Sequence, residues 1–321
     1  MDLGSALLEG LSLTFGVKFL LSPVYLSATV LIVWAIWLYR GKPVGFWRFM
    51  LPRELYMHPS TMVDLKVGLF NTLFTATGAI SVLFVTPYVT IAVLEQLGGR
   101  MAASGGVWAG VAAAALLFLT QDFCRYWNHY LHHETKVLWP FHAVHHSAEV
   151  MTPLTFLRAH PMYSALQALM ISALVGVMQA LVLWALVGEI ESWAIYAGAL
   201  AFNTYIFFGA HLRHSHIWVS YGRVMEHILI SPAQHQVHHS SNPKHHDKNY
   251  GEVFAIWDWM FGTLYVPAGY EKLEYGLADR NGNKIPQKHP TLKDALVGPF
   301  VEVWEEIIKG TSIAANKEPE A

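Results

Sequence analysis

The sequence predicts an all-α fold, a multi-pass integral-membrane helical bundle with a histidine-rich cytosolic helical cap. Composition is the first observation: the 321 residues are 54 % hydrophobic and 14 % charged, whereas a soluble domain usually carries about a quarter charged residues. The second is the alternation of long uncharged stretches with short polar segments. The third is the placement of the 18 histidines, all of which except His58 and His289 lie between His129 and His246.

The N-terminal segment, residues 1–66, is predicted to hold one membrane helix and a basic cytosolic loop. No charged residue occurs from Leu20 to Tyr39, which is about the length that a helix needs to cross ~30 Å of hydrocarbon. Basic residues follow this span, and the positive-inside rule places such a segment in the cytoplasm. They are Arg40, Lys42, Arg48, Arg53 and Lys66.

Four further uncharged stretches predict two membrane hairpins within a second domain, residues 67–265. They cover residues 67–94, 101–121, 161–188 and 192–210. Pro87 is expected to kink or divide the first of them. A stripe at helical spacing continues beyond the second stretch, so that helix is predicted to extend out of the bilayer. The stripe consists of Asp122, Tyr126, His129 and His133.

No segment after His211 is apolar and long enough to span a bilayer, so residues 266–321 are predicted to form a C-terminal cytosolic segment. Apolar residues there repeat at helical spacing and predict a helix whose stripe serves packing or contact with the membrane surface. They are Leu296, Phe300, Val303, Trp304 and Ile307.

Two copies of the pattern H-x-V-H-H-S carry the chemistry. They begin at His142 and His235, and a proline stands just upstream of each, at the start of a predicted helix. Residues i, i+3 and i+4 share one face of a helix, so each copy is predicted to present three imidazoles in one direction. A lone histidine is usually a satisfied core residue, but that interpretation does not account for two identical triplets. The pattern therefore indicates a metal-binding surface.

The clustered imidazoles outnumber the ligands of one ion. His129 and His133 form an i, i+4 pair ahead of the triplets. One transition metal takes roughly four to six ligands, so two ions are predicted. Imidazole suits iron, zinc and copper alike. The single cysteine, Cys124, can form neither an internal disulfide nor a zinc ribbon.

The motifs, taken together, resemble the fatty acid hydroxylase/sterol desaturase superfamily over about residues 65 to 265. They are Asp122, Tyr126 and Trp127 before His129 and His133, L-W-x-F-H-x-V-H-H-S from Leu138 to Ser147, R-x-H-P from Arg158 to Pro161, H-x-V-H-H-S from His235 to Ser240, and D-K-N-Y-G, W-D and F-G-T between Asp247 and Thr263. The resemblance implies that the second domain is catalytic and belongs to a membrane-bound, non-haem di-iron enzyme. Such an enzyme uses dioxygen and two electrons to hydroxylate or desaturate a lipid.

The resemblance also implies a set of metal ligands, with no catalytic side chain beyond them. The candidates are His129, His133, His142, His145, His146, His211, His214, His235, His238 and His239. At the intermediate box His214 is preferred and His211 is second, whereas His216 occupies a position where relatives often carry asparagine.

Six residues are expected near the ligands without binding metal. Asp122, Asp247 and Asp258 are candidates to accept the second N–H of a ligand imidazole. The others are His132, His160 and His216. Tyr163 stands where the superfamily often has an acidic residue after R-x-H-P, which leaves the role of His160 open.

The implied cofactors are two iron ions, which zinc could replace in a purified sample, with no bound haem, flavin or nicotinamide. No G-x-G-x-x-G or C-x-x-C-H motif occurs, so a separate protein, cytochrome b5-like or ferredoxin-like, is expected to supply electrons. The lipid substrate is expected to arrive from the bilayer at a histidine cluster on the cytoplasmic side. Scattered basic residues and a net charge of −2 give no footprint for nucleic acid.

Several alternatives stay open. The short H-x-x-x-H box and the R-x-H-P motif favour hydroxylation over desaturation. A metal transporter would usually place its ligands near the bilayer midplane rather than beyond the spans. A zinc-dependent lipid hydrolase is a further alternative, because two-metal sites also activate water. The substrate, whether fatty acyl, sphingolipid, sterol, ether lipid or carotenoid, is not identified by the sequence.

Overall fold

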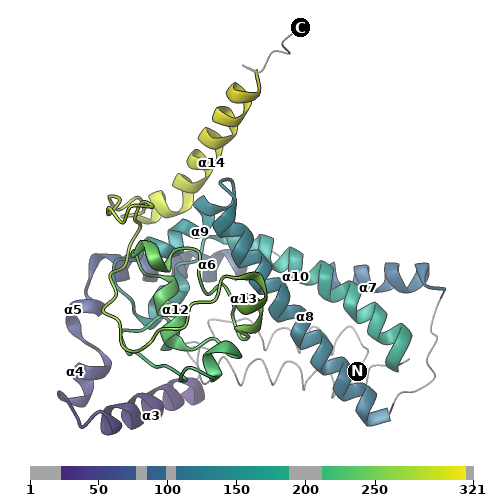
Figure 1. The fold of residues 1–321 in the computed structure, drawn as a ribbon. Coiled ribbons are helices and arrows are strands. Elements are labelled where there is room, and N and C mark those ends of the chain that lie inside the picture. The colour runs from purple at the N-terminus through teal and green to yellow at the C-terminus, as the bar shows by residue number, and fades with distance from the viewer. Residues whose placement is uncertain (1–22, 77–84, 99–105, 188–211, 316–321) are drawn as a thin grey trace. The chain divides into compact units, whose positions relative to one another are not determined.

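The computed structural model describes residues 23–76, 85–98, 106–187 and 212–315 (Figure 1). Within these ranges the regular elements are helices. The same ranges contain no β-strand, and their only bridges are two isolated pairs, Leu229 with Phe254 and Ala278 with Lys284. The predicted all-α class is therefore confirmed for the described part of the chain.

Two compact units interleave along the sequence. The first, called here the apolar unit, comprises residues 1–52, 75–126 and 165–211. The second comprises residues 53–74, 127–164 and 212–321 and is called the histidine unit, because it carries the described candidate ligands. The histidine unit takes in residues on both sides of the predicted domain boundaries at residues 66 and 265.

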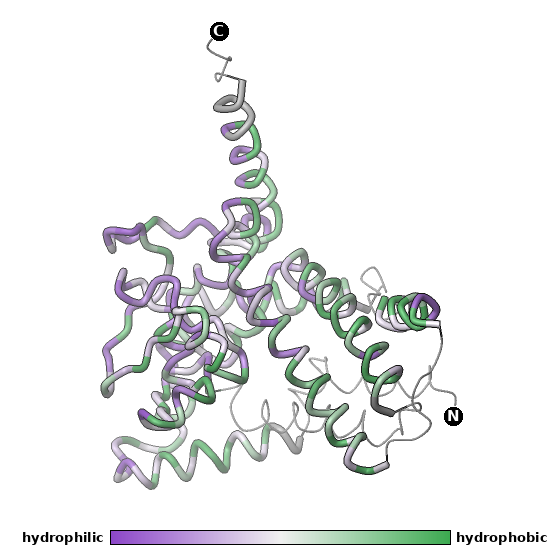
Figure 2. Tube along the Cα trace, turned by 45° about the vertical axis from the view of Figure 1, so that its right-hand side comes forward, coloured by the Kyte–Doolittle hydropathy of each residue, from purple (hydrophilic) through white to green (hydrophobic). Residues whose placement is uncertain are grey.

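Long apolar helices dominate the apolar unit. Two helices are long and apolar enough to cross a membrane by length and composition, Gly106–Glu134 and Pro161–Ala185, and Leu26–Tyr39 is a shorter apolar helix. They correspond to α8 (Gly106–Glu134), α10 (Pro161–Val182, followed by a π-helical turn over Leu183–Val187) and α3 (Pro23–Tyr39). Figure 2 shows the colour along α8 passing from hydrophobic toward hydrophilic as the helix approaches its histidines.

The predicted span over residues 67–94 does not form one described helix. Its two ends belong to α6 (Pro59–Ala76) and α7 (Val85–Gln96), and residues 77–84 between them lie outside the described part. Pro87 lies in the first turn of α7, where a proline removes no helical hydrogen bond. The predicted span over residues 192–210 and the first residues of the spans at Leu20 and Met101 also lie outside the described residues.

The segment predicted to be a basic loop is largely helical. It contains α4 (Phe46–Met50), α5 (Arg53–Tyr56) and the first turns of α6. Short helices are compatible with a basic connection between membrane spans, and the cytosolic position of this segment stays a prediction.

Glycine permits close packing of α7 on α10 in the apolar unit. A Cβ at Gly176 would lie 2.8 Å from the Cβ of Val89 and 2.9 Å from the carbonyl oxygen of Thr86. The hydroxyl of Thr90 donates to the carbonyl oxygen of Gly176 at 3.1 Å. Small residues and hydroxyl contacts of this kind are typical of helix pairs in a lipid environment.

Short helices surround the histidines of the histidine unit. They are α9 (Trp139–His146), α12 (Pro232–His238), α13 (Ile256–Phe261) and the 3₁₀ turns Pro153–Leu157, Met225–His227 and Pro243–His245. The predicted helix starts are confirmed, with proline in the first turn of both α9 and α12. At α12 the Ser231 hydroxyl accepts from the Gln234 N–H, and the Gln234 side chain accepts from the Ser231 N–H, which is a capping box.

A buried ion pair joins α6 to Arg158, whose guanidinium also bonds α9. The side chains of Arg158 and Asp64 are both fully buried, and Nη1 of the arginine lies 3.1 Å from Oδ1 of the aspartate. The guanidinium also donates to the Val144 carbonyl at 2.8 Å, to the Ser147 hydroxyl at 2.9 Å and to the His289 carbonyl at 3.1 Å. One side chain therefore fixes the middle and the end of α9.

The predicted C-terminal helix is present as α14 (Leu292–Ala315). Part of its apolar stripe packs on α9, because the Phe300 ring lies 5.2 Å from the Phe141 ring, centroid to centroid. Trp304 on the same stripe is 64 % exposed. Packing on α9 therefore accounts for only part of the stripe.

Candidate metal centre

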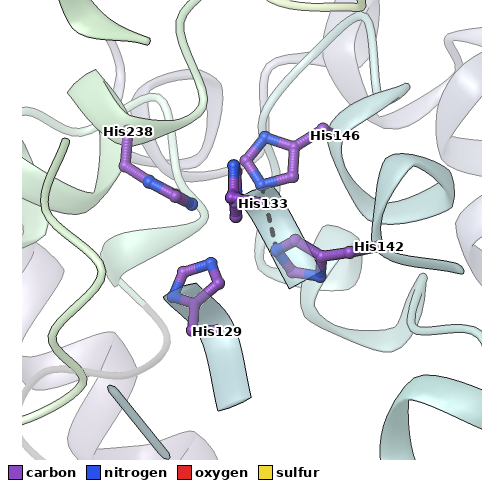
Figure 3. A group of neighbouring side chains, drawn as sticks. All are labelled: His129, His133, His142, His146 and His238. Atoms are coloured by element: carbon purple, nitrogen blue, oxygen red, sulfur yellow. Dashed lines mark hydrogen bonds between the residues drawn. The ribbon is translucent and has the colours of Figure 1, made fainter. Parts of the chain in front are cut away.

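The continuation of α8 beyond its apolar part supplies the first two imidazoles. His129 and His133 lie in the last turns of this helix, and their i, i+4 spacing places both rings on one face. The predicted extension of the helix past the apolar stretch is confirmed. Figure 3 shows the two rings pointing toward side chains from α9 and α12.

Nine histidines form two groups of converging nitrogens. Within each group, one nitrogen from every ring lies within 4.8 Å of one nitrogen from every other ring. The five-histidine group, drawn in Figure 3, consists of His129, His133, His142, His146 and His238. The four-histidine group consists of His145, His214, His235 and His239.

The α9 triplet is divided between the two groups. His142 and His146 belong to the five-histidine group, whereas His145 belongs to the four-histidine group. This corrects the expectation that the three imidazoles of a triplet point in one direction. Positions i+3 and i+4 are separated by about 100° around a helix, which is enough for adjacent histidines to reach different sites.

The α12 triplet is divided in the opposite sense. His235 and His239 join the four-histidine group, and His238 joins the five-histidine group. The rings of His146 and His239, one from each group, stack with centroids 4.4 Å apart. Each short helix therefore contributes to both groups, and the groups share a boundary.

The spacing of the nitrogens in the four-histidine group fits a shared ion. Nε2 of His214 lies 3.0 Å from Nε2 of His145 and 2.9 Å from Nε2 of His235, which in turn lies 3.2 Å from Nε2 of His239. Two nitrogens bound to one ion at about 2.1 Å and at right angles stand about 3.0 Å apart.

Hydrogen bonding alone does not explain this spacing. A neutral ring nitrogen carries either one proton or one lone pair. Nε2 of His214 and Nε2 of His235 nevertheless each have two neighbouring Nε2 atoms at hydrogen-bonding distance. A cation that accepts a lone pair from every ring accounts for all these contacts at once.

Backbone carbonyls fix the tautomers in the five-histidine group. Nδ1 of His129 donates to the carbonyl oxygen of Tyr250 at 2.9 Å, and Nδ1 of His238 donates to that of Lys248 at 2.7 Å. A protonated Nδ1 leaves the lone pair on Nε2. Nε2 of both rings, and of His133, is buried and has no hydrogen-bond partner among the described residues, as expected of nitrogens that ligate an ion.

All nine rings are set up to be neutral. Burial is the main cause that lowers the pKa of every histidine in both groups. The pKa of His129 falls to about 4 and that of His145 to about 3. Metal ions bind the neutral form of imidazole, so the site is in its binding form at neutral pH.

Asp258 acts on the backbone that holds a ligand. The fully buried carboxylate accepts from the N–H of Tyr250 at 2.8 Å, from that of Gly251 at 2.7 Å and from the Thr263 hydroxyl at 2.6 Å. It thereby fixes the peptide segment whose carbonyl receives His129. Burial raises the pKa of Asp258 to about 6. The sequence predicted a direct bond to an imidazole, whereas Asp258 acts on His129 through the backbone of Tyr250.

The other two predicted carboxylates lie in different settings. Asp247 is exposed, has a positive φ of 59° and accepts from the Tyr250 hydroxyl at 3.4 Å. Asp122 is fully buried on α8, within the apolar unit.

Among the three histidines proposed for the intermediate box, His214 is the one found in a group. His216 is half-buried and belongs to neither group. His211 lies outside the described residues. The preference for His214 thus agrees with the geometry, although ligation itself stays a prediction.

His132 and His160 are held by backbone groups. The ring of His132 is buried, and its Nδ1 donates to the carbonyl of Asn128 at 2.7 Å. His160 uses both nitrogens: Nδ1 accepts from the Met162 N–H at 3.0 Å, and Nε2 donates to the Leu296 carbonyl at 3.1 Å. His160 therefore ties the start of α10 to α14.

Two tyrosines at the five-histidine group were not identified as site residues from the sequence. The ring of Tyr250 lies 4.9 Å from that of His133, and the ring of Tyr163 stacks on His142 at 4.6 Å, centroid to centroid. Tyr250 stands within the D-K-N-Y-G motif, which was a usable signal. Tyr163 was noted only as a departure from the R-x-H-P pattern, because α10 alone does not reveal what faces its first turn.

This chain is similar in sequence to one protein family and to several known enzymes. Residues 114–263 match a family model described as fatty acid hydroxylase. The chain is 34 % identical to the alkylglycerol monooxygenase of Homo sapiens over 160 residues, which are 50 % of this chain and 32 % of that protein. It therefore matches about a third of the length of the alkylglycerol monooxygenases.

Two more distant relatives are named for reactions on other lipids. An ornithine lipid hydroxylase of Rhizobium tropici is 27 % identical over 173 residues, 54 % of this chain and 48 % of that protein. A delta(7)-sterol 5(6)-desaturase of Aspergillus fumigatus is 24 % identical over 193 residues, 56 % of this chain and 59 % of that protein. No solved structure matches the chain at a significant level.

Proposed function

Because residues 114–263 of this chain belong to the fatty acid hydroxylase family, we propose that the protein is a membrane-bound, non-haem di-iron oxygenase that hydroxylates a C–H bond of a lipid. The reaction would consume one dioxygen, two external electrons and two protons, and release the alcohol and water. The pair of adjacent, all-imidazole groups is the observation that carries this proposal.

The chain offers one ion site per group. The five-histidine group would hold one iron and the four-histidine group the other. When bound, the irons would supply the activation of dioxygen and the oxidation of the C–H bond. Nine neutral imidazoles would leave the positive charge of two divalent ions uncompensated within the ligand set.

The protein's own residues orient the rings and exclude water. The carbonyls of Tyr250 and Lys248 hold two rings of the five-histidine group with Nε2 facing inward. The valines at the centre of the two triplets, Val144 and Val237, are fully buried. Val144 packs against Val63, Val67 and Ala295, so apolar contacts behind the α9 triplet would limit the entry of water from that side.

The helices that carry the site residues support a membrane setting. Trp108 on α8 and Leu169 on α10 are 82 % and 50 % exposed, as expected of side chains that face lipid. The α8 helix continues directly into His129 and His133, and α10 carries Tyr163 in its first turn. The lipid substrate would reach the five-histidine group from the bilayer.

The orientation and the partners are part of the same proposal. The basic residues between Arg40 and Lys66 favour a cytoplasmic position for the histidine unit. Electrons would come from a separate donor, a cytochrome b5-like or ferredoxin-like protein. The names of the relatives favour a membrane lipid as substrate without selecting one.

Metal analysis combined with oxygen uptake tests the proposal. Detergent-purified protein from iron-replete cells should contain about two irons per chain and consume dioxygen after reduction. With ¹⁸O-labelled dioxygen and membrane lipids, the product should gain one labelled oxygen atom. Tightly bound zinc, with no oxygen uptake after reconstitution with iron, would contradict the proposal and favour a hydrolase.

Desaturation is the second candidate, and the 24 % identity to a sterol desaturase favours it. The same site could remove two hydrogens rather than insert oxygen. Product mass distinguishes the reactions, because hydroxylation adds one oxygen and desaturation removes two hydrogens.

A further inference from the structure

Three oxidisable aromatic rings run from the five-histidine group toward the surface of the histidine unit. The Tyr250 ring lies 4.9 Å from His133, the Tyr130 ring 5.4 Å from Tyr250, and the Trp127 ring 5.2 Å from Tyr130, centroid to centroid. Tyr250 is fully buried, whereas Tyr130 and Trp127 are half-buried. The three side chains therefore form a continuous path of ring contacts outward from a ligand imidazole.

The path reaches an exposed apolar surface. Beyond Trp127 lies the Phe261 ring, 5.1 Å away and 42 % exposed. Trp259 and Met260 on the same short helix are 66 % and 63 % exposed. An external electron donor would meet the outer end of the path at this surface.

The hydroxyl of Tyr250, the innermost of the three rings, has two carboxylates beside it that can accept a proton. The Tyr250 hydroxyl donates to Oε1 of Glu134 at 3.2 Å and to Oδ1 of Asp247 at 3.4 Å. Both carboxylates belong to exposed residues. The phenol is the donor in both hydrogen bonds, so it carries its proton in the resting protein. A phenol that loses an electron becomes a strong acid, and the proton then has a carboxylate to receive it.

We propose that Tyr250 gives one electron to the oxidised metal centre when no lipid is in position, and that Tyr130 and Trp127 connect Tyr250 to the external electron donor. This inference rests on the proposed function. In the first step the centre is reduced by one electron, the phenolic O–H bond breaks, and the proton passes to Glu134 or Asp247. A neutral tyrosyl radical is left. An electron carried inward over Trp127 and Tyr130 restores the phenol, and the carboxylate returns the proton.

Such a route would protect the ligand imidazoles. An oxidant generated without substrate attacks whatever lies nearest, and the groups beside the site are the histidines and the aromatic rings packed against them, Tyr250 among them. Because the Tyr250 ring can be oxidised and then reduced again, its oxidation would be reversible and would spare the ligand histidines.

Electron paramagnetic resonance tests the proposal directly. Iron-loaded, chemically reduced protein is mixed with dioxygen in the absence of lipid and frozen at increasing times. A tyrosyl signal is expected, and its hyperfine pattern should collapse when the protein carries ring-deuterated tyrosine. Tyr250→Phe should lose the signal and keep its iron content, because the anchor of His129 is the backbone carbonyl of residue 250.

Tyr265→Phe is the matched control. The hydroxyl of Tyr265 also donates to a carboxylate, Oε1 of Glu271 at 2.7 Å, but its ring contacts His245, which belongs to neither group. This variant should keep the radical signal. Tyr130→Phe or Trp127→Phe should leave the signal in place and slow its decay several-fold when an external donor is present.

Two results would overturn the inference. One is an unchanged signal in Tyr250→Phe, and the other is a wild-type protein that consumes dioxygen without forming a tyrosyl radical. Neither of these results contradicts the proposed oxygenase. A wild-type protein that takes up iron but never consumes dioxygen would overturn both, so the two failures are distinguishable.

Discussion

Nε of Arg158 donates to the carbonyl oxygen of Val144 at 2.8 Å, so a fully buried guanidinium holds the centre of the α9 histidine triplet. The same group is paired with Asp64, 94 residues away in the sequence. This relationship links the orientation of three candidate ligands to an ion pair that binds no metal.

Arg158→Lys is expected to weaken metal binding while the fold is kept. Lysine preserves the charge opposite Asp64 but cannot bond Val144, Ser147 and the aspartate in the same fork geometry. We expect metal affinity to fall by about 10- to 100-fold, the usual range for groups that orient ligands. Titration of metal-free protein with iron under anaerobic conditions measures this change. Wild-type affinity in Arg158→Lys would show that the guanidinium does not position α9.

Arg158→Met should instead destabilise the protein. It leaves Asp64 buried without its partner, which typically costs about 3–5 kcal/mol. Arg223→Lys serves as the control for both variants, because Arg223 is exposed and its replacement should change neither stability nor metal affinity.

Single ligand substitutions should strip one ion each. His145→Ala removes a nitrogen from the four-histidine group and His238→Ala removes one from the five-histidine group. Each variant is expected to lose turnover and about one of two irons, with helical content retained. Inductively coupled plasma mass spectrometry and circular dichroism give the two readouts.

His227→Ala is the control, since His227 bonds the carbonyl of Arg223 and lies in neither group. Full activity in His145→Ala or His238→Ala would contradict the ligand assignment. The loss of both irons in either variant would show that the two sites do not fill independently.

The helices and the concentration of histidines follow from sequence pattern alone. The uncharged stretch that ends at Gln121 and the polar stripe beyond it predict one continuous helix, and α8 is that helix. The division of the triplets does not follow from pattern. Helical periodicity gives the angle between His145 and His146 but not which group lies on either side of them.

The groups that orient the histidine rings could not be predicted from the sequence, for a different reason. The partner of His129 is a carbonyl oxygen, which every residue possesses, so residue type carries no signal for it. The pairing of Arg158 with Asp64 depends on tertiary contact between distant segments, and neither residue is marked by its neighbours.

Gly251→Ala should disturb the five-histidine group from outside it. A Cβ at this position would lie 2.6 Å from the carbonyl oxygen of Phe254 and 2.7 Å from Oδ2 of Asp258. The peptide must shift, and the carbonyl of Tyr250 that holds His129 shifts with it. We expect a destabilisation of about 1–3 kcal/mol and a fall in iron affinity, measured by thermal unfolding in detergent and by metal titration.

Gly269→Ala is the matched control, because a Cβ at Gly269 meets no heavy atom within 4 Å. The control should bind iron as the wild type does. An equal loss of iron affinity in both variants would exclude a specific role for the segment that carries Tyr250.

The metal-free protein should lose stability as the pH falls from about 7 toward 5. An unfolded histidine has a pKa of about 6.5, whereas burial lowers the pKa of His129 to about 4 and that of His145 to about 3 in the folded protein. Between these values the unfolded chain binds more protons than the folded chain, so acid favours unfolding. Each ring contributes up to roughly 1.4 kcal/mol per unit of pKa difference.

Asp258 opposes this trend, since its folded pKa is raised to about 6. Protonation of its carboxylate stabilises the folded protein as the pH falls through 6, and the gain is complete below about 3.9, the usual pKa of an unfolded aspartate. The nine histidines with a lowered pKa outnumber the two buried aspartates with a raised pKa, Asp258 and Asp64, so the net effect of acid is destabilising. Chemical denaturation of chelator-treated protein at pH 7.5, 6.5 and 5.5 should give a falling free energy of unfolding. A free energy of unfolding that is constant over this range would mean that the nine rings are not buried together in the metal-free protein.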